Sequence, residues 1–370
     1  MSSTERIISV DIFRGLTIAA MILVNTPGTW SHVYAPFLHA EWHGLTPTDL
    51  IFPFFLFIVG MSITFAYSKK KEMGIQSAIY KKIVSRTLKL IFLGLFLAAF
   101  TLSFPFIKNL SGLRIPGVLQ RIGVVFFIAS MLFLHCNWKV LLGIFIAILI
   151  IYWLLMTQIP IHGEMPLLTK ESNLGSVIDL KVLTVDHMWK TLYDPEGILS
   201  TLPSIATSIF GMFLGIILLK KGYSKQEKLI YFLIIGAIAL GIGYLWSASF
   251  PLNKALWTSS FVLVTGGWAC LIYALIYYIA DILGKQTWGR PAIIFGSNAI
   301  TVYFLSSFTS KCFGLIKLSS GQSLHGYLYE MLSSVITIPK MSSLIYAIIV
   351  ILFYYLIAHI LYKKKIFIKV

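Results

Sequence analysis

The apolar residues of this sequence gather into stretches long enough to cross a membrane as helices. An α-helix rises about 1.5 Å per residue, so about 20 mostly apolar residues span the hydrocarbon core of a bilayer. A shorter stretch near 325–337 is at most an amphipathic or re-entrant element. Ten stretches reach the required length: 7–25, 46–67, 83–105, 116–135, 139–158, 199–219, 229–248, 256–281, 290–309 and 342–362. We predict an all-α, polytopic membrane protein of about ten transmembrane helices, forming a single transmembrane domain over residues 1–370.

The composition agrees with this class and argues against a nucleic-acid partner. Charged residues make up 12% of the chain, about half of the roughly 25% that is usual in soluble domains. The net charge is +16, but the basic residues lie in short clusters between apolar stretches, the pattern that orients membrane helices. Three cysteines show neither a disulfide framework nor the spacing of metal ligands.

The distribution of Lys and Arg predicts the orientation in the membrane. An even number of spans places both termini on one side, and that side carries 19 of the 30 Lys and Arg residues, against 9 on the opposite side. Basic residues are enriched on the cytoplasmic side, so both termini are predicted to be cytoplasmic. The one long polar segment, about 159–198, is then on the outer side.

The titratable residues of the outer side are concentrated between the first two apolar stretches. His32, His39 and His43 lie there, close to Asp49. Histidine titrates near neutral pH, so it can take a proton from an amine or a hydroxyl, or be acylated itself. Asn25, at the end of the first stretch, can offer an amide donor to a developing oxyanion.

Asp49 also has a structural explanation. Thr46 is a favourable N-cap, Pro47 is favourable at the first helical position, and a carboxylate at Asp49 stabilises the positive end of the helix dipole. We therefore expect a helix to begin at this point.

Charged residues also occur inside the apolar stretches, where they are costly and usually functional. Arg14 lies three residues after Asp11, on the same helix face, so the two can form an ion pair. Arg121 lies more than a turn inside its stretch, and Asn298 is a polar group inside an apolar helix that needs a partner.

Three types of function fit these residues. His39, Glu41 and His43 alternate, as ligands on an extended strand would, but their order differs from that of the zinc proteases. A transporter also fits ten spans with intramembrane charges, although the polar groups cluster at the outer boundary and not at the midplane. The third type is group transfer, with His39 as the base or the nucleophile.

Seven segments resemble the heparan-α-glucosaminide N-acetyltransferase family, in order and over almost the whole chain. They are 9–15 (SVDIFRG), 37–46 (FLHAEWHGLT), 49–53 (DLIFP), 114–121 (RIPGVLQR), 193–199 (YDPEGIL), 253–257 (NKALW) and 362–367 (YKKKIF). The resemblance implies a transmembrane enzyme of a bacterial inner (cytoplasmic) membrane. Such an enzyme moves acetyl from cytoplasmic acetyl-CoA to the amino group of glucosamine, or of a glucosamine-terminated saccharide, on the outer side.

The family's catalytic histidine and asparagine fall on His39 and Asn25. Whether the histidine carries the acetyl group or acts as a base stays open, as does the oligomeric state, for which a homodimer is one candidate. The animal enzyme has Asn where this chain has His43, which puts the animal polysaccharide in doubt as the substrate. A sugar transporter and an envelope-glycan O-acetyltransferase remain alternatives.

The remaining candidate residues follow from charge, topology and the matched segments. We expect the segment 159–198 to form a cap over His39, and we expect no metal. The expected acceptor-binding residues are Trp42, His43, Asp49, Asp194, Glu196 and Asn253. The expected acetyl-CoA-binding residues are Arg14, Arg114, Arg121, Asn298 and Lys364.

Overall fold

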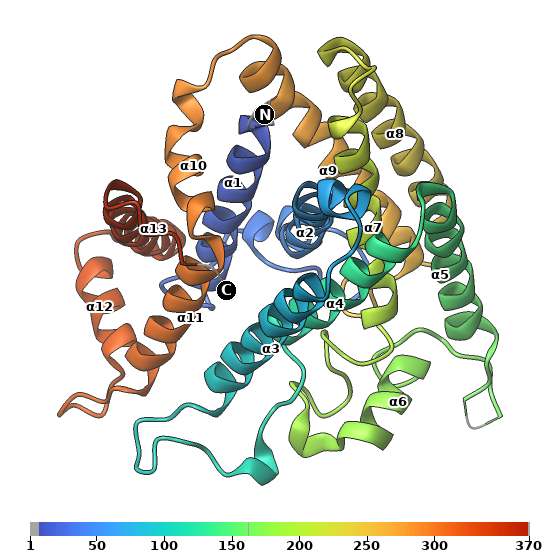
Figure 1. The fold of residues 1–370 in the computed structure, drawn as a ribbon. Helices are drawn as coiled ribbons and strands as arrows, with labels where there is room; N and C mark the ends of the chain where they lie inside the picture. Colours follow the sequence, from blue (N-terminus) through green and yellow to red (C-terminus); the bar gives the residue numbers. More distant parts are fainter. Residues whose placement is uncertain (1–6, 162, 369–370) are drawn as a thin grey trace.

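The regular structure of this computed structural model, which describes residues 7–161 and 163–368, is helical (Figure 1). This confirms the predicted all-α class. Short helical turns are η1 (Ala35–Phe37), η2 (Leu110–Gly112), η3 (Val185–His187), η4 (Tyr278–Ile282) and η5 (Thr287–Gly289). The α-helices are α1 (Ile8–Asn25), α2 (Pro47–Glu72), α3 (Ser77–Ala99), α4 (Val118–His135), α5 (Trp138–Gln158), α6 (Leu174–Leu183), α7 (Thr201–Leu219), α8 (Lys225–Trp246), α9 (Ser259–Tyr277), α10 (Arg290–Ser297), α11 (Ala299–Leu315), α12 (Leu324–Ser333) and α13 (Pro339–Lys363).

Fewer helices than the expected ten have the properties of an ordinary membrane span. Within the described residues, eight helices are long and apolar enough, and a ninth span results if α10 and α11, bent by 69° at Asn298, are counted together. The expected span that is not apolar enough is α3, although its 23 residues are sufficient in length. Every 18-residue window of α3 contains at least three Lys or Arg residues, so α3 is too polar to face lipid on all sides.

The centre of the bundle is formed by α2, α7 and α9, which are mostly buried, whereas α8 and α13 expose most of their surface. Glycines let α2 and α7 approach closely. A Cβ on Gly60 would lie 1.8 Å from the carbonyl oxygen of Ser208, and one on Gly211 would lie 1.9 Å from that of Phe57. Small residues at such crossings are typical of helix packing in membranes. Asp49 and the residues that follow it in α2 are thereby held in a rigid position.

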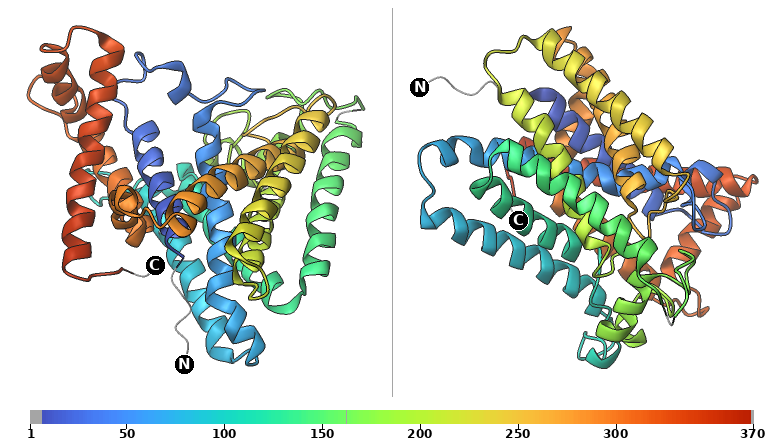
Figure 2. Two further views of the ribbon diagram at one scale, coloured as in Figure 1. Left: turned by 90° about the horizontal axis from the view of Figure 1, so that it is seen from above. Right: turned by 90° about the vertical axis from the view of Figure 1, so that its right-hand side faces the viewer.

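The two ends of the bundle differ in what they carry. The segment 26–46 lies at one end, together with the first turn of α2, and we call this the His39 end (Figure 2, left). The beginning of α1 and the end of α13 lie toward the opposite end. There the side chain of Asn298 binds the last described residues, because its Nδ2 donates to the carbonyl of Ile366 (3.0 Å) and its Oδ1 accepts from the backbone N–H of Ile368 (2.8 Å).

Candidate active site

His39 and Asp49 form a hydrogen-bonded pair at the His39 end. The Nδ1 atom of His39 lies 2.6 Å from Oδ1 of Asp49. The Asp49 side chain is 1% exposed, whereas that of His39 is 46% exposed. The carboxylate is therefore fixed inside the protein, and the imidazole that it orients remains accessible.

The start of α2 holds the Asp49 carboxylate in place. Thr46 is the N-cap and Asp49 the third residue of a capping box, which confirms the predicted helix start. The Oδ2 atom of Asp49 accepts from the backbone N–H groups of Thr46 (3.0 Å) and Ala40 (3.1 Å). One oxygen thus binds the backbone on both sides of the site, and the other is left for His39.

This arrangement sets the tautomer of His39. An ionised carboxylate only accepts hydrogen bonds, so Nδ1 of His39 must carry the hydrogen that Asp49 binds. Nε2 then keeps its lone pair and can accept a proton, as a general base does. The Asp49 carboxylate thus fixes both the tautomer and the orientation of the imidazole.

Lys254 contacts the same imidazole from the loop between α8 and α9. Its Nζ lies 2.9 Å from Nε2 of His39, and the two residues are 215 positions apart in sequence. Burial lowers the pKa of the Lys254 ammonium, although the charges of Asp49 and Glu196 favour its protonated form. Lys254 was not among the predicted site residues, although it belongs to the matched segment 253–257.

Asn253 fixes this loop against the segment that carries His39. Its Oδ1 accepts from the backbone N–H of Leu256 (2.9 Å), and its Nδ2 lies 3.3 Å from Nδ1 of His43. Partial burial lowers the pKa of His43, so near neutral pH its Nδ1 is an acceptor for the Asn253 amide. Asn253 and His43 therefore lie next to the pair, and their binding of acceptor remains a prediction.

Trp42 connects the site to the long segment 159–198. Its Nε1 donates to the carbonyl of Leu168 (2.8 Å), its ring packs edge-on against Tyr193 with centroids 5.0 Å apart, and Nζ of Lys170 lies 5.8 Å from its ring. The segment 159–198 thus contacts the residues beside His39. That it acts as a cap over bound acceptor remains a prediction.

Two residues expected to bind acceptor pair with one expected to bind acetyl-CoA. Arg114 donates to both oxygens of Asp194, at 2.9 and 2.6 Å, and to Glu196 at 2.6 Å. These carboxylates raise the pKa of Arg114 although its burial acts in the opposite direction. Asp194 also accepts from the backbone of Trp189 (2.7 Å). This cluster fastens the loop before α4 to the segment before α7.

Arg121 lies in the protein interior, next to this cluster. It is 2% exposed, and its Nη2 donates to the carbonyl of Gly197 (3.1 Å) and to Ser200 Oγ (2.5 Å). Its guanidinium also lies 5.2 Å from the ring centroid of Trp257. Nε and Nη1 of Arg121 are buried without a hydrogen-bond partner among the described residues. Arg121 therefore lies at the His39 end.

The buried carboxyl of Asp179, in α6, predicts a pH-dependent stability. Burial raises its pKa from 3.8 to about 6, although the backbone N–H of Ile198 donates to it at 2.8 Å. Between about pH 4 and pH 6 the folded protein holds a proton that the unfolded chain releases, so stability falls as pH rises through this window. Asp179→Asn should raise the melting temperature at pH 7, and this gain should vanish toward pH 4. Thermal unfolding of the wild type and of Asp179→Asn in detergent, measured from pH 4 to pH 7, tests this prediction. A difference in melting temperature that stays the same across this range would contradict it.

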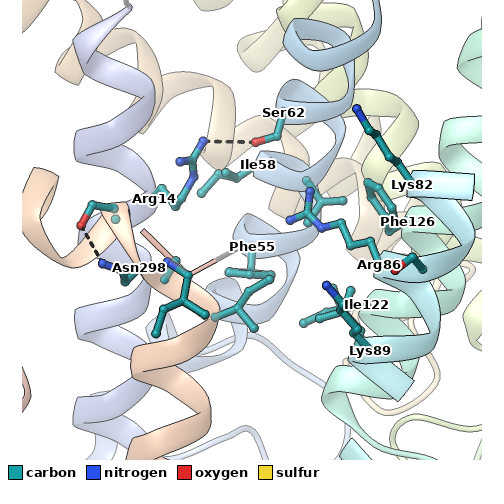
Figure 3. Close-up of a pocket in the computed structure, with 18 of the residues that line it drawn as sticks. Arg14, Phe55, Ile58, Ser62, Lys82, Arg86, Lys89, Ile122, Phe126 and Asn298 are labelled. Carbon is teal, nitrogen blue, oxygen red and sulfur yellow. Dashed lines mark hydrogen bonds between the residues drawn. The ribbon is translucent and has the colours of Figure 1, made fainter. Parts of the chain in front are cut away.

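A cavity of about 780 Å³ lies between α1, α2, α3, α4 and the break between α10 and α11. Figure 3 shows Arg14 and Asn298 on one side of it and the basic residues of α3 on the other. None of the described residues that line it is Asp or Glu. Its cationic residues are Arg14, Lys81, Lys82, Arg86 and Lys89.

The cations of the cavity are arranged to receive an anion. Nε of Arg86 is buried without a hydrogen-bond partner in the described part of the chain, and its guanidinium stacks 4.7 Å from the ring centroid of Phe126. Arg14 is hydrogen-bonded to Ser62 Oγ (3.2 Å) and paired with Asp11 (3.4 Å). Several positive charges beside an apolar wall favour a ligand with clustered negative charge and an apolar arm.

A second cavity, of about 470 Å³, lies between α11, α12 and α13. The described residues that line it include no Lys, Arg, Asp or Glu, and its walls are mainly apolar. A charged ligand therefore favours the first cavity.

The structure separates the predicted residues into two groups. The His39 end contains His39, Trp42, His43, Asp49, Arg114, Arg121, Asp194, Glu196 and Asn253. Arg14 and Asn298 line the cationic cavity, whereas Lys364 is exposed and lies outside its lining. Asn25 ends α1 and is exposed, and within the described residues no hydrogen bond joins it to His39. No three His, Cys, Asp or Glu side chains in this part of the chain gather as metal ligands.

Comparison with known proteins identifies relatives of this chain. A family model described as "Heparan-alpha-glucosaminide N-acetyltransferase, catalytic" matches residues 6–247. The heparan-alpha-glucosaminide N-acetyltransferase of Homo sapiens is 30% identical over 422 aligned residues, covering 99% of this chain and 60% of that protein. That of Mus musculus is 29% identical over 426, covering 100% of this chain and 61% of that protein. This chain thus spans about three fifths of the length of the relatives that it matches.

Proposed function

Because this chain belongs to the heparan-alpha-glucosaminide N-acetyltransferase family, we propose that it transfers acetyl from acetyl-CoA to the amino group of glucosamine or of a glucosamine-terminated saccharide. One observation carries the proposal. The same rigid helix, α2, holds Asp49 against His39 at one end and lines the cationic cavity with Phe55, Ile58 and Ser62 further along. A base for an amine and a site for a polyanionic donor are thereby connected.

The cavity is suited to the donor. Acetyl-CoA carries several phosphate charges at one end and an uncharged pantetheine arm with the thioester at the other. The phosphates would lie against Lys81, Lys82, Arg86 and Lys89, and the arm would follow the apolar face of α2 toward His39. At about 1.5 Å per residue, Phe55 lies about 9 Å along α2 from Asp49, a distance that an extended pantetheine arm can cover.

His39 then acts on the acceptor amine. As a general base it takes a proton from the amine at Nε2 while Asp49 stabilises the resulting imidazolium. As a nucleophile it would hold the acetyl group itself before transfer. Asn25 is proposed to stabilise the oxyanion, which requires that α1 and the segment 26–46 bring it closer to His39 when substrates bind.

The sidedness follows from the basic residues. The lining of the cavity includes Tyr67 and Ala78, on either side of the α2–α3 turn, and Ile368, after α13. Lys69, Lys70 and Lys363 to Lys365 lie in the same segments. We propose that this end faces the cytoplasm, with both termini, and that the His39 end faces outward from a bacterial inner membrane. Residues 1–370 would then act as one domain, with the segment 159–198 as its cap.

Purified protein with labelled acetyl-CoA and glucosamine tests this function, with glucose as the matched acceptor that lacks the amine. We expect labelled N-acetylglucosamine and no product from glucose. An ester product that hydroxylamine cleaves would instead identify an O-acetyltransferase. Uptake of unmodified sugar into proteoliposomes, without any acetyl transfer, would identify a transporter and contradict the proposal.

A further inference from the structure

The amine of Lys254 lies against the imidazole of His39. Its Nζ lies 2.9 Å from Nε2 of His39 and 3.2 Å from Nδ1. A base must lie about 2.6–3.2 Å from the atom whose proton it takes. Because Asp49 binds the hydrogen on Nδ1, Nε2 is the proton-accepting atom. The similar distances to both ring nitrogens place Nζ of Lys254 over the face of the imidazole, from where a rotation of its flexible side chain brings the amine in line with Nε2.

The loop that carries Lys254 is held by hydrogen bonds, so the position of Lys254 is determined by the fold. Asn253 and Thr258 are both buried, and the backbone N–H of Asn253 donates to Thr258 Oγ1 (3.2 Å). The loop also binds the His39 segment directly, because the backbone N–H of Gly44 donates to the carbonyl of Leu252 (2.8 Å). The backbone at Lys254 is therefore fixed in position, and its side chain reaches His39 from there.

We propose that Lys254 is a self-acetylation site: in the absence of an acceptor, its Nζ stands in for the acceptor amine and receives acetyl from the thioester donor. This inference rests on the proposed function, since it uses the same donor and the same base. It predicts a specific covalent modification of this chain and a direct competition between Lys254 and the acceptor for Nε2 of His39.

The reaction balances without an oxidant or reductant. The Lys254 ammonium gives a proton to Nε2 of His39, and the neutral Nζ attacks the thioester carbonyl. The new C–N bond forms, the C–S bond breaks, and the thiolate leaves and is protonated as CoA. The amide nitrogen loses its second proton, so one proton in total passes to solvent for each acetyl-lysine formed.

Burial favours acetylation of this lysine over exposed ones. Burial lowers the pKa of Lys254 and so raises the fraction of neutral, nucleophilic amine at a given pH. Lys170 and Lys190 lie at the same end of the protein, where their Nζ atoms stack 5.8 Å from Trp42 and 5.7 Å from Trp189. They serve as internal controls for unspecific chemical acetylation.

Peptide mass spectrometry of the full-length protein, incubated with isotopically labelled acetyl-CoA, tests the proposal. Without acceptor we expect stoichiometric label on Lys254, at least 10-fold above that on Lys170 and Lys190. Glucosamine at saturating concentration should suppress this label, and His39→Ala should reduce it to the level of the control lysines. Lys254→Arg should carry no label at this position.

The same preparation must also acetylate glucosamine, which separates this proposal from the proposed function. If glucosamine is acetylated but Lys254 stays unlabelled, the self-acetylation is wrong and the function stands. Equal labelling in wild type and His39→Ala would also overturn it, because the modification would then be unspecific chemistry. If neither glucosamine nor Lys254 is labelled, both proposals fail.

Discussion

His39→Ala is expected to lower kcat for acetyl transfer by about 10²–10⁴-fold, the contribution of a positioned general base. The substitution removes Nε2, which takes the proton, and leaves the cationic cavity unchanged. The affinity for acetyl-CoA should therefore stay within about 2-fold of wild type. Steady-state kinetics with saturating donor, combined with equilibrium binding of acetyl-CoA, measures the two effects separately.

Asp49→Asn tests whether the pair, and not His39 alone, performs the reaction. An asparagine amide can donate to Nδ1, which would place the imidazole hydrogen on Nε2 and remove the proton-accepting atom. We expect a loss of kcat similar to that of His39→Ala. Thr48→Ala is the matched control at the same helix start, because Thr48 is buried and its hydroxyl donates to the carbonyl of Pro36 (3.0 Å), away from the pair. Near-normal kcat in Asp49→Asn would show that the carboxylate has no part in orienting the base.

The second large effect is expected in the cavity. Arg86→Ala should weaken acetyl-CoA binding by about 10-fold or more, because a hydrogen bond to a charged group contributes about 1.5–3 kcal/mol. Arg86→Ala combined with Lys89→Ala should lose about 10²-fold, while kcat at saturating donor changes little. Isothermal titration of purified protein with acetyl-CoA, at two salt concentrations, measures the loss and its electrostatic origin.

The control for this series is Lys69→Ala. Lys69 carries the same charge at the same end of the bundle, but it is exposed and lies outside the cavity lining. It should leave the affinity unchanged. Arg86→Ala should also leave the fold intact, since Nε of Arg86 is buried without a partner among the described residues. Equal losses in Lys69→Ala and Arg86→Ala would contradict a specific site.

The number of spans was the weakest part of the sequence-based prediction, for a physical reason. Hydropathy alone assigns α3 to the membrane, but its Lys82, Arg86 and Lys89 follow one face of the helix at spacings of four and three residues. These side chains line a cavity and not the lipid. This spacing is visible in the sequence, and helical periodicity is sufficient to identify the cationic face from it.

The bend at Asn298 was the other deviation. A polar residue in an apolar stretch indicated a partner but not a break, and the partner is the backbone at Ile366 and Ile368, which lies far away in the sequence. Such contacts between distant segments cannot be derived from one sequence.

The sequence indicates several residues of the candidate site but not the hydrogen bonds that join them. The helix-start pattern around Asp49 is local, so the sequence was sufficient to predict it. The bond between Asp49 and His39 depends on how the loop between them folds, and the contact between His39 and Lys254 joins residues 215 positions apart. Arg114 was assigned to the donor and Asp194 to the acceptor, because charge and topology cannot reveal that the two bind each other.

Transfer across the membrane is the central claim, and sealed proteoliposomes test it most directly. Acetyl-CoA is enclosed inside the vesicles and glucosamine is supplied only outside, or both are supplied only outside. Molecules whose cavity faces the lumen should acetylate external glucosamine in the first arrangement, and no product should form in the second. Product formed only when donor and acceptor share one side would contradict the account, because the cavity and His39 would then serve the same face of the membrane.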